Sequence, residues 1–154
     1  MTHEGQHKFN NFTPVTGAME LAEYVFKITD NPNKFKDFTV KDKKNEDGTI
    51  SRLIISRNDS LTNRVRDMAN EIFLLTYTAN EIDLRKQPER KEERLSKQVE
   101  AIRLCSELLA EIQLCRMHFH MDHKRVLFWG EKVRNVRAAI EKWHESDKDR
   151  YKDI

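Results

Sequence analysis

Glycine, proline and cysteine are scarce in this chain of 154 residues, which has four glycines, three prolines and two cysteines. A many-turned β-sandwich, a β-barrel or a glycine-rich nucleotide-binding fold needs more turn-forming residues than that. Hydrophobic residues make up 38% of the chain and charged residues 35%, above the ~25% that is usual in soluble domains. This balance is typical of a helical bundle with narrow apolar seams, and the length suits one domain.

The sequence also lacks the marks of an exported or membrane-bound protein. No run of about 18 apolar residues occurs, and the first eleven residues are polar and unlike a secretory signal. We therefore expect a soluble, cytoplasmic protein that makes no membrane contact. Cys105 and Cys115 lie about 15 Å apart along one expected helix, beyond the roughly 7 Å that a disulfide spans, so we expect free thiols.

Four segments carry apolar residues at the three- and four-residue spacing of amphipathic helices. The expected seams are Ala18, Leu21, Ala22, Val25 and Ile28; Leu61, Val65, Met68, Ile72, Leu75, Ala79 and Ile82; Leu95, Val99, Ile102, Cys105, Leu109 and Ile112; and Val126, Trp129, Val133, Val136, Ile140 and Trp143. Leu104, Leu108, Cys115 and Phe119 widen the third seam. Short connectors between such helices predict an all-α protein, an antiparallel up-down four-helix bundle over residues 17–146.

The two ends of the chain carry no helical periodicity. Residues 1–16 are expected to form a flexible N-terminal arm, and the charged residues 147–154 a C-terminal tail that frays.

Between the first and second helices, about residues 36–57, the pattern changes to short β-prone runs around the turn sequence Asn45-Glu46-Asp47-Gly48. Asp-Gly between two such runs predicts a β-hairpin, because glycine readily adopts the positive φ of tight hairpin turns. An isolated hairpin is marginally stable in water, so we expect this one to contact the helices or another subunit.

No catalytic constellation stands out in the chain. It has no nucleophile elbow, phosphate-binding loop or Cys-x-x-Cys, and its paired carboxylates lie in helical stretches rich in Arg and Lys. His118, His120 and His123, with Cys115 nearby, are the only cluster that resembles a metal site, and a polar helix end explains them better. A metal-binding bundle would use Cys115, His118 and His123. We expect no enzyme, no cofactor and no metal, with a metal-binding bundle as a minor alternative.

The net charge is only +2, so binding of nucleic acid requires local clustering of basic residues. The last helix is the most basic element, with six basic and two acidic residues between Lys124 and Lys142. The candidate phosphate-contacting residues are Arg64, Arg66, Lys124, Arg125, Lys132, Arg134 and Arg137. An ordinary surface helix explains the charge about as well.

The order of four short stretches is similar to that in a family of small bacterial and phage four-helix bundles. The stretches are Lys34-Phe35 with Phe38-Thr39; Ser60-Leu61-Thr62-Asn63-Arg64-Val65-Arg66-Asp67; Arg94-Leu95-Ser96-Lys97-Gln98; and Trp129 with Lys142-Trp143. The family comprises the accessory variability determinant proteins of diversity-generating retroelements and the proteins encoded by intervening sequences of large-subunit ribosomal RNA genes. The resemblance spans roughly residues 18–146.

This resemblance implies a non-enzymatic accessory protein of a diversity-generating retroelement. Such a protein forms a ring-like homo-oligomer, a pentamer, and binds the reverse transcriptase together with structured RNA or DNA. Two alternatives stay open: an rRNA intervening-sequence-type bundle, and a protein-interaction scaffold that does not touch nucleic acid. The two family branches and the oligomer number are not distinguished by the sequence.

Overall fold

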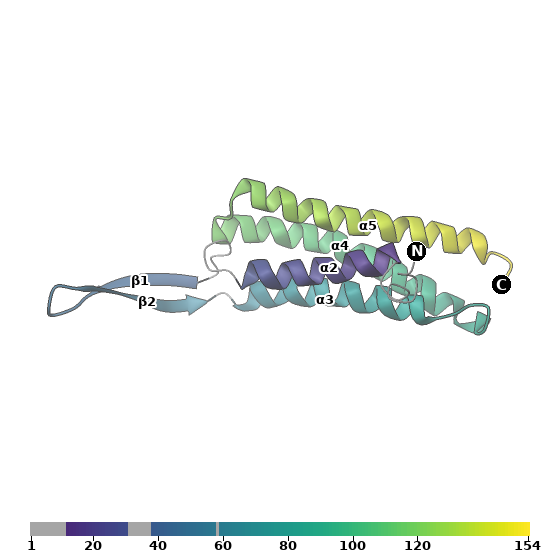
Figure 1. Cartoon of the computed structure of the whole chain (residues 1–154), viewed down its shortest axis with the longest axis horizontal. Helices are drawn as coiled ribbons and strands as arrows, with labels where there is room; N and C mark the ends of the chain where they lie inside the picture. Colours follow the sequence, from purple (N-terminus) through teal and green to yellow (C-terminus); the bar gives the residue numbers. More distant parts are fainter. Residues whose placement is uncertain (1–11, 31–37, 58) are drawn as a thin grey trace, which may run out of the picture.

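A computed structural model describes residues 12–30, 38–57 and 59–154, with the backbone alone for residues 38–42, 52–57 and 59. The described chain contains four long helices, which pack side by side in alternating directions (Figure 1). They are α2 (Thr13–Thr29), α3 (Asp59–Glu81), α4 (Lys91–Phe119) and α5 (His123–Arg150), with a short 3-10 turn, η1 (Pro88–Arg90), before α4. The predicted all-α antiparallel four-helix bundle is confirmed.

The core consists of the seams that the spacing predicts for three of the helices. Leu21 and Val25 of α2, Ile72 of α3 and Trp129 and Ile140 of α5 are at most 1% exposed. Full burial of such a side chain contributes about 1.5–3 kcal/mol, so these seams supply most of the stabilisation of the bundle.

The seam of α4 agrees with the prediction only in part. Cys105 and Ile112 of the predicted stripe are at most 1% exposed, and Ile102 and Leu109 are half-buried against the core, but Val99 is 52% exposed. The residues expected to widen the stripe are in the core, and so are Ala101 and the polar Gln98, which the prediction left out. Apolar residues occur all round α4, so spacing alone does not single out its buried face.

The first helix begins before the predicted residue 17. Helix α2 starts at Thr13 with Pro14 in its first turn, where the missing N–H of proline is tolerated. The predicted arm of residues 1–16 thus loses its last residues to the helix, and residues 1–11 lie outside the described part of the chain.

The last helix continues into the segment predicted as a tail. Helix α5 ends at Arg150, and Asp147 is 1% exposed. The predicted tail of residues 147–154 is therefore wrong over its first four positions, because Asp147 is held by an ion pair to α4.

The predicted hairpin is present between α2 and α3. Strands β1 (Phe38–Lys44) and β2 (Ile50–Arg57) pair antiparallel, with Val40 opposite Ile54 and a register shift between Thr39 and Val40. Gly48 has a φ of 86° in the turn, where Thr49 N donates to the Asp47 carboxylate over 3.0 Å. Positions 36 and 37 of the predicted insertion lie outside the described residues.

The hairpin extends away from the bundle, beyond the end at which α2 stops and α3 starts (Figure 1). We call this the hairpin end of the molecule and the opposite one the distal end. The expectation that the hairpin leans on its own helices is not met along its length, so contact with another molecule stays a prediction. None of the described helices is long and apolar enough to cross a membrane.

Candidate nucleic-acid interface

The seven basic residues predicted to contact phosphate lie on different sides of the bundle. Arg64 and Arg66 are near the start of α3, and the other five lie between positions 124 and 137 of α5. Their contacts divide them among the α3–α4, α2–α3, α2–α5 and α4–α5 faces, and each group has a different environment.

Arg64 is occupied by an ion pair on the α3–α4 face. Its Nε and Nη2 donate to the two carboxylate oxygens of Glu111 over 3.2 and 2.8 Å. The hydrogen bond to Glu111 raises the pKa of Arg64. This fork-shaped pair ties α3 to α4 and leaves Arg64 a weaker candidate for phosphate contact than its exposure suggests.

Arg66 joins the end of α2 to α3. Its Nε donates over 2.8 Å to the Thr29 hydroxyl, which itself donates to the Val25 carbonyl over 2.7 Å. The guanidinium lies 5.3 Å from the ring centroid of Phe26, which is 46% exposed. Arg66 has no carboxylate partner within the described residues, so its charge is available to an incoming anion.

A second cation–aromatic cluster lies on the α2–α5 face. The rings of Tyr24 and Phe128 meet edge to face at 5.5 Å, and Lys132 Nζ lies 5.3 and 5.0 Å from their centroids. Burial raises the pKa of Tyr24, while Arg125 beside its hydroxyl lowers it in part. Phe128 is 50% exposed, so an aromatic surface and two cations face solvent together.

The remaining cations of α5 differ in their hydrogen bonds and ion pairs. Arg137 Nη1 donates to Ser106 of α4 over 3.3 Å, and its Nε lies 3.9 Å from Glu141. Lys124 and Arg134 are exposed, and in the described part of the chain neither has a carboxylate within ion-pair distance.

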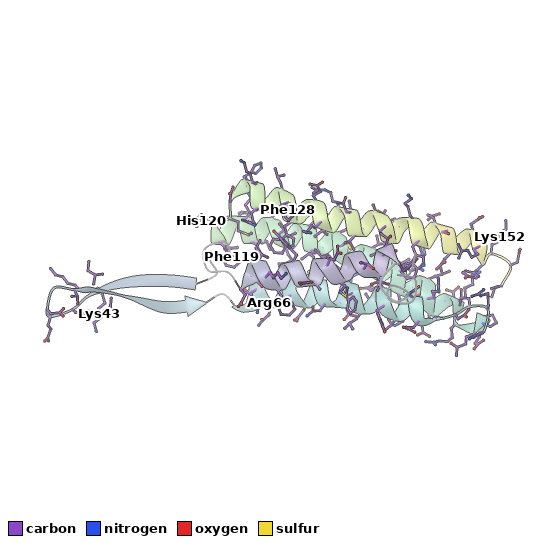
Figure 2. All side chains as sticks on the ribbon, viewed as in Figure 1. Lys43, Arg66, Phe119, His120, Phe128 and Lys152 are labelled. Atoms are coloured by element: carbon purple, nitrogen blue, oxygen red, sulfur yellow. The ribbon has the colours of Figure 1, made fainter. Side chains whose placement is uncertain are left out.

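The cation–aromatic contacts of Arg66 and Lys132 therefore lie on both sides of α2 and toward the hairpin end. Figure 2 shows Arg66 and Phe128 in the half of the bundle from which the hairpin extends. The sequence reading selected the cations and missed Tyr24, Phe26 and Phe128. A usable signal was present, because Phe128 stands beside the seam residue Trp129 in the most basic helix, where a polar residue is usual.

The structure does not support the metal-binding alternative. In the described residues, no group of three or more His, Cys, Asp or Glu side chains is placed to hold an ion. Cys115 is buried in the core, whereas His118 and His123 are exposed. Both cysteines are free thiols, as predicted, and burial raises the pKa of Cys105 to about 12.

The sequence reading also missed a buried polar cluster at the distal end. Arg94 Nε and Nη2 donate to the Asp147 carboxylate over 2.7 and 3.1 Å, and Arg94 Nη1 donates to the Ile82 carbonyl over 2.7 Å. Gln98 Nε2 donates to Asp147 over 2.6 Å, and its Oε1 lies 2.8 Å from Nδ1 of His144. Arg94 and Asp147 are 8% and 1% exposed.

This cluster has a structural role that the contacts explain. It ties α4 to α5 and to the carbonyl at the end of α3, and the Arg94 guanidinium lies 5.4 Å from the ring centroid of Trp143. A groove of about 710 Å³ lies beside it, with Asn80, Lys142 and Arg150 among its lining residues. Arg94 and Asp147 are already bonded to each other, so the groove offers a ligand mainly the rim cations Lys142 and Arg150.

Comparisons with protein-family models, with curated protein sequences and with solved structures find no match. The family resemblance therefore rests on the four stretches of sequence named above. The structural argument for a function therefore comes from the cations and the exposed aromatic rings at the hairpin end.

Proposed function

We propose that the protein is a non-enzymatic accessory protein of a diversity-generating retroelement, bacterial or phage-encoded and cytoplasmic. It binds structured RNA or DNA and the reverse transcriptase, as a ring-like homo-oligomer of five copies. The proposal combines the family resemblance with one structural observation, the unpaired cations at the hairpin end.

Most of the predicted cations have no acidic partner among the described residues. Among the side chains that the structure describes, five of the predicted cations have no carboxylate within ion-pair distance: Arg66, Lys124, Arg125, Lys132 and Arg134. Lysine and arginine that are not neutralised by a neighbouring carboxylate gain most from binding a phosphate, since no existing ion pair has to be broken. Their positions near the start of α3 and in the first half of α5 put them at the hairpin end of the bundle.

Assembly strengthens this argument. A charge of +2 per chain is modest, but five copies carry +10, and a ring sets the same surface five times in register. Phosphate contacts of this kind fix position and do not read sequence, so we expect recognition by shape and charge and a steep loss of affinity with salt.

The hairpin is the basis for proposing a protein partner. A two-stranded hairpin is marginally stable alone. The strand ends beside its turn carry exposed side chains, among them Lys43, Lys44 and Ile50, the last 68% exposed. Strands that extend from a bundle with open edges are suited to pairing with another chain. We assign this role to contact with the reverse transcriptase.

Charge reversal at the two exposed cations of α5, Lys124 and Arg134, tests the proposal. The double variant Lys124→Glu/Arg134→Glu should bind a structured RNA at least about tenfold more weakly than the wild type at low salt, measured by fluorescence anisotropy. The matched control is Lys86→Glu/Lys152→Glu, which makes the same charge change on two exposed residues away from the hairpin end. Lys86 lies in the connection between α3 and α4, and Lys152 lies at the distal end (Figure 2). Equal losses in both variants would mean that net charge alone matters, and the proposed surface would be wrong.

The protein-interaction scaffold is the second candidate, and the extended hairpin is the observation that favours it. Under that function, no RNA or DNA is retained even at low salt, while a partner protein is captured by the wild type and not by a variant without the hairpin. The rRNA intervening-sequence branch would keep the fold and would be supported by binding to ribosomal RNA without any reverse transcriptase.

A further inference from the structure

We infer that Phe26 and Phe128 are stacking platforms for unpaired bases, so that the interface takes single-stranded segments in preference to duplex. This inference rests on the proposed nucleic-acid binding and names the form of nucleic acid that the surface fits. It depends on how the two rings are held and on which charges lie beside them.

The Phe128 ring is held from within the bundle. It packs edge to face on Tyr24, whose ring lies 6.4 Å from that of the fully buried Trp129. Lys132 Nζ lies 5.0 Å from the Phe128 centroid, yet half of the residue's surface faces solvent. A ring fixed in this way loses little conformational freedom when a base stacks on it.

Phe26 repeats the arrangement on the other side of α2. It is 46% exposed, and the guanidinium over its ring belongs to Arg66, which donates a 2.8 Å hydrogen bond to Thr29. Each ring thus has a cation at about 5 Å that is not paired with a carboxylate in the described residues. A nucleotide presents the complementary pair of groups, an aromatic base and a phosphate.

The molecule contains an aromatic pair that lacks this feature. Phe73 and Tyr77 of α3 lie 5.7 Å apart, and Tyr77 is 42% exposed. No cation lies over either ring among the described residues. Exposed aromatic surface alone therefore does not define the site, and Tyr77 provides a matched control.

The decisive probe separates bases from phosphates. Two labelled oligonucleotides of equal length, one of thymidines and one of abasic residues, carry the same charge and differ only in the presence of bases. Stacking is worth about 1–3 kcal/mol per base, so two platforms should make the wild-type protein bind the thymidine strand at least tenfold more tightly. A duplex of the same length carries twice the phosphates but stacks its bases internally, so the thymidine strand should still bind more tightly than the duplex.

The double variant Phe26→Leu/Phe128→Leu keeps the rings' apolar bulk and removes their aromatic faces. It should lose the preference for bases and keep the wild-type affinity for the abasic strand, while Tyr77→Leu should change neither. Circular dichroism melting curves confirm that each variant is folded, and the wild-type comparison of the two strands needs no variant.

The outcomes separate the inference from the proposed function. Equal wild-type binding to both strands, or a preference that survives in the double variant, would overturn the stacking role and leave phosphate binding intact. Absence of binding to either strand and to the duplex at low salt would overturn the proposed function and the inference with it.

Discussion

Arg94 and Asp147 form an ion pair that is almost wholly removed from water, and its energetics depend on both partners being present. Attraction between buried charges offsets the loss of hydration only where further hydrogen bonds satisfy the remaining polar atoms. Gln98 and the Ile82 carbonyl supply those bonds here. The pair therefore fixes how α4 and α5 meet, and loss of one member leaves a buried charge unpaired.

Replacement of Asp147 by alanine should lower the free energy of unfolding by about 3–5 kcal/mol, because Arg94 would stay buried without its carboxylate. Urea denaturation followed by circular dichroism measures the change. The control is Asp149→Ala, two residues along the same helix and exposed, for which we expect a change within about 0.5 kcal/mol. A loss of less than 1 kcal/mol in Asp147→Ala would show that the pair does not hold the helices together.

His144 gives the same cluster a dependence on pH. Burial lowers the pKa of His144 in the folded protein, Lys148 lowers it further, and Glu145 and Asp147 oppose them. The unfolded chain therefore takes up the proton first as the pH falls. We therefore expect the free energy of unfolding to be at its full value above about pH 6.5, and to decrease as the pH falls from there through the pKa of folded His144.

Urea denaturation at pH 7.5 and pH 5 tests the His144 effect. The wild type should lose more stability between the two conditions than His144→Gln, which cannot titrate there. His118→Gln, an exposed position at the other end of the bundle, is the control and should behave as the wild type does. A larger loss in His144→Gln than in the wild type would reverse the sign and contradict the account.

At this scale, the sequence does not reveal ion pairs between residues that are far apart along the chain. Arg94 and Asp147 are 53 positions apart, and Arg64 and Glu111 are 47 apart, so no local spacing connects them. A partial signal existed, because Arg94 and Gln98 precede Ala101 at the three- and four-residue steps of the buried face of α4. Polar residues in line with a seam predict burial, although not the partner.

At the scale of elements, the hairpin and the helices are nearly independent. The chain leaves the bundle at β1 and returns from β2, and Phe38 pairs with Arg57 where the two strands start and end. Paired positions in adjacent strands lie about 5 Å apart, so a short linker can join the two ends.

A variant in which residues 38–57 are replaced by a short Gly-Ser linker should therefore fold as the wild type does. We expect a melting temperature within about 4 °C of the wild type, because none of these residues whose side chain the structure describes belongs to the bundle core. Circular dichroism thermal melts measure it. Loss of a cooperative transition would mean that the hairpin contributes to the bundle core after all.

Helix number, order and turn chemistry were predictable because they depend on neighbours along the chain. The steps of α2 and α5 place their seams correctly, and Asp47-Gly48 predicts the turn. The steps of α3 are right at five positions, but Met68 and Leu75 are half-buried and Ala69 and Thr76 are buried in their place. Helix α4 was misread because Val99 and Leu108 have the same hydropathy but different neighbours. The start of α2 was misread because Pro14 and Gly17 are usual helix breakers that the first turns tolerate.

On the scale of the whole molecule, the two ends of the bundle differ in character. The distal end is closed by a buried polar cluster, whereas the hairpin end carries cations and half-exposed rings around α2. The net charge of +2 hides this difference. The cations were predictable from composition, but their grouping with Phe26 and Phe128 requires the fold.

The measurement that most directly tests nucleic-acid binding is the affinity of the full-length protein for a structured RNA across a series of salt concentrations. We expect retention at low salt, with the logarithm of the binding constant falling linearly as the logarithm of the salt concentration rises, at a slope steeper than about −2. Light scattering of the same sample should report a ring-sized oligomer. No retention at the lowest salt concentration, or an affinity that does not change with salt, would contradict binding through the phosphate-contacting cations.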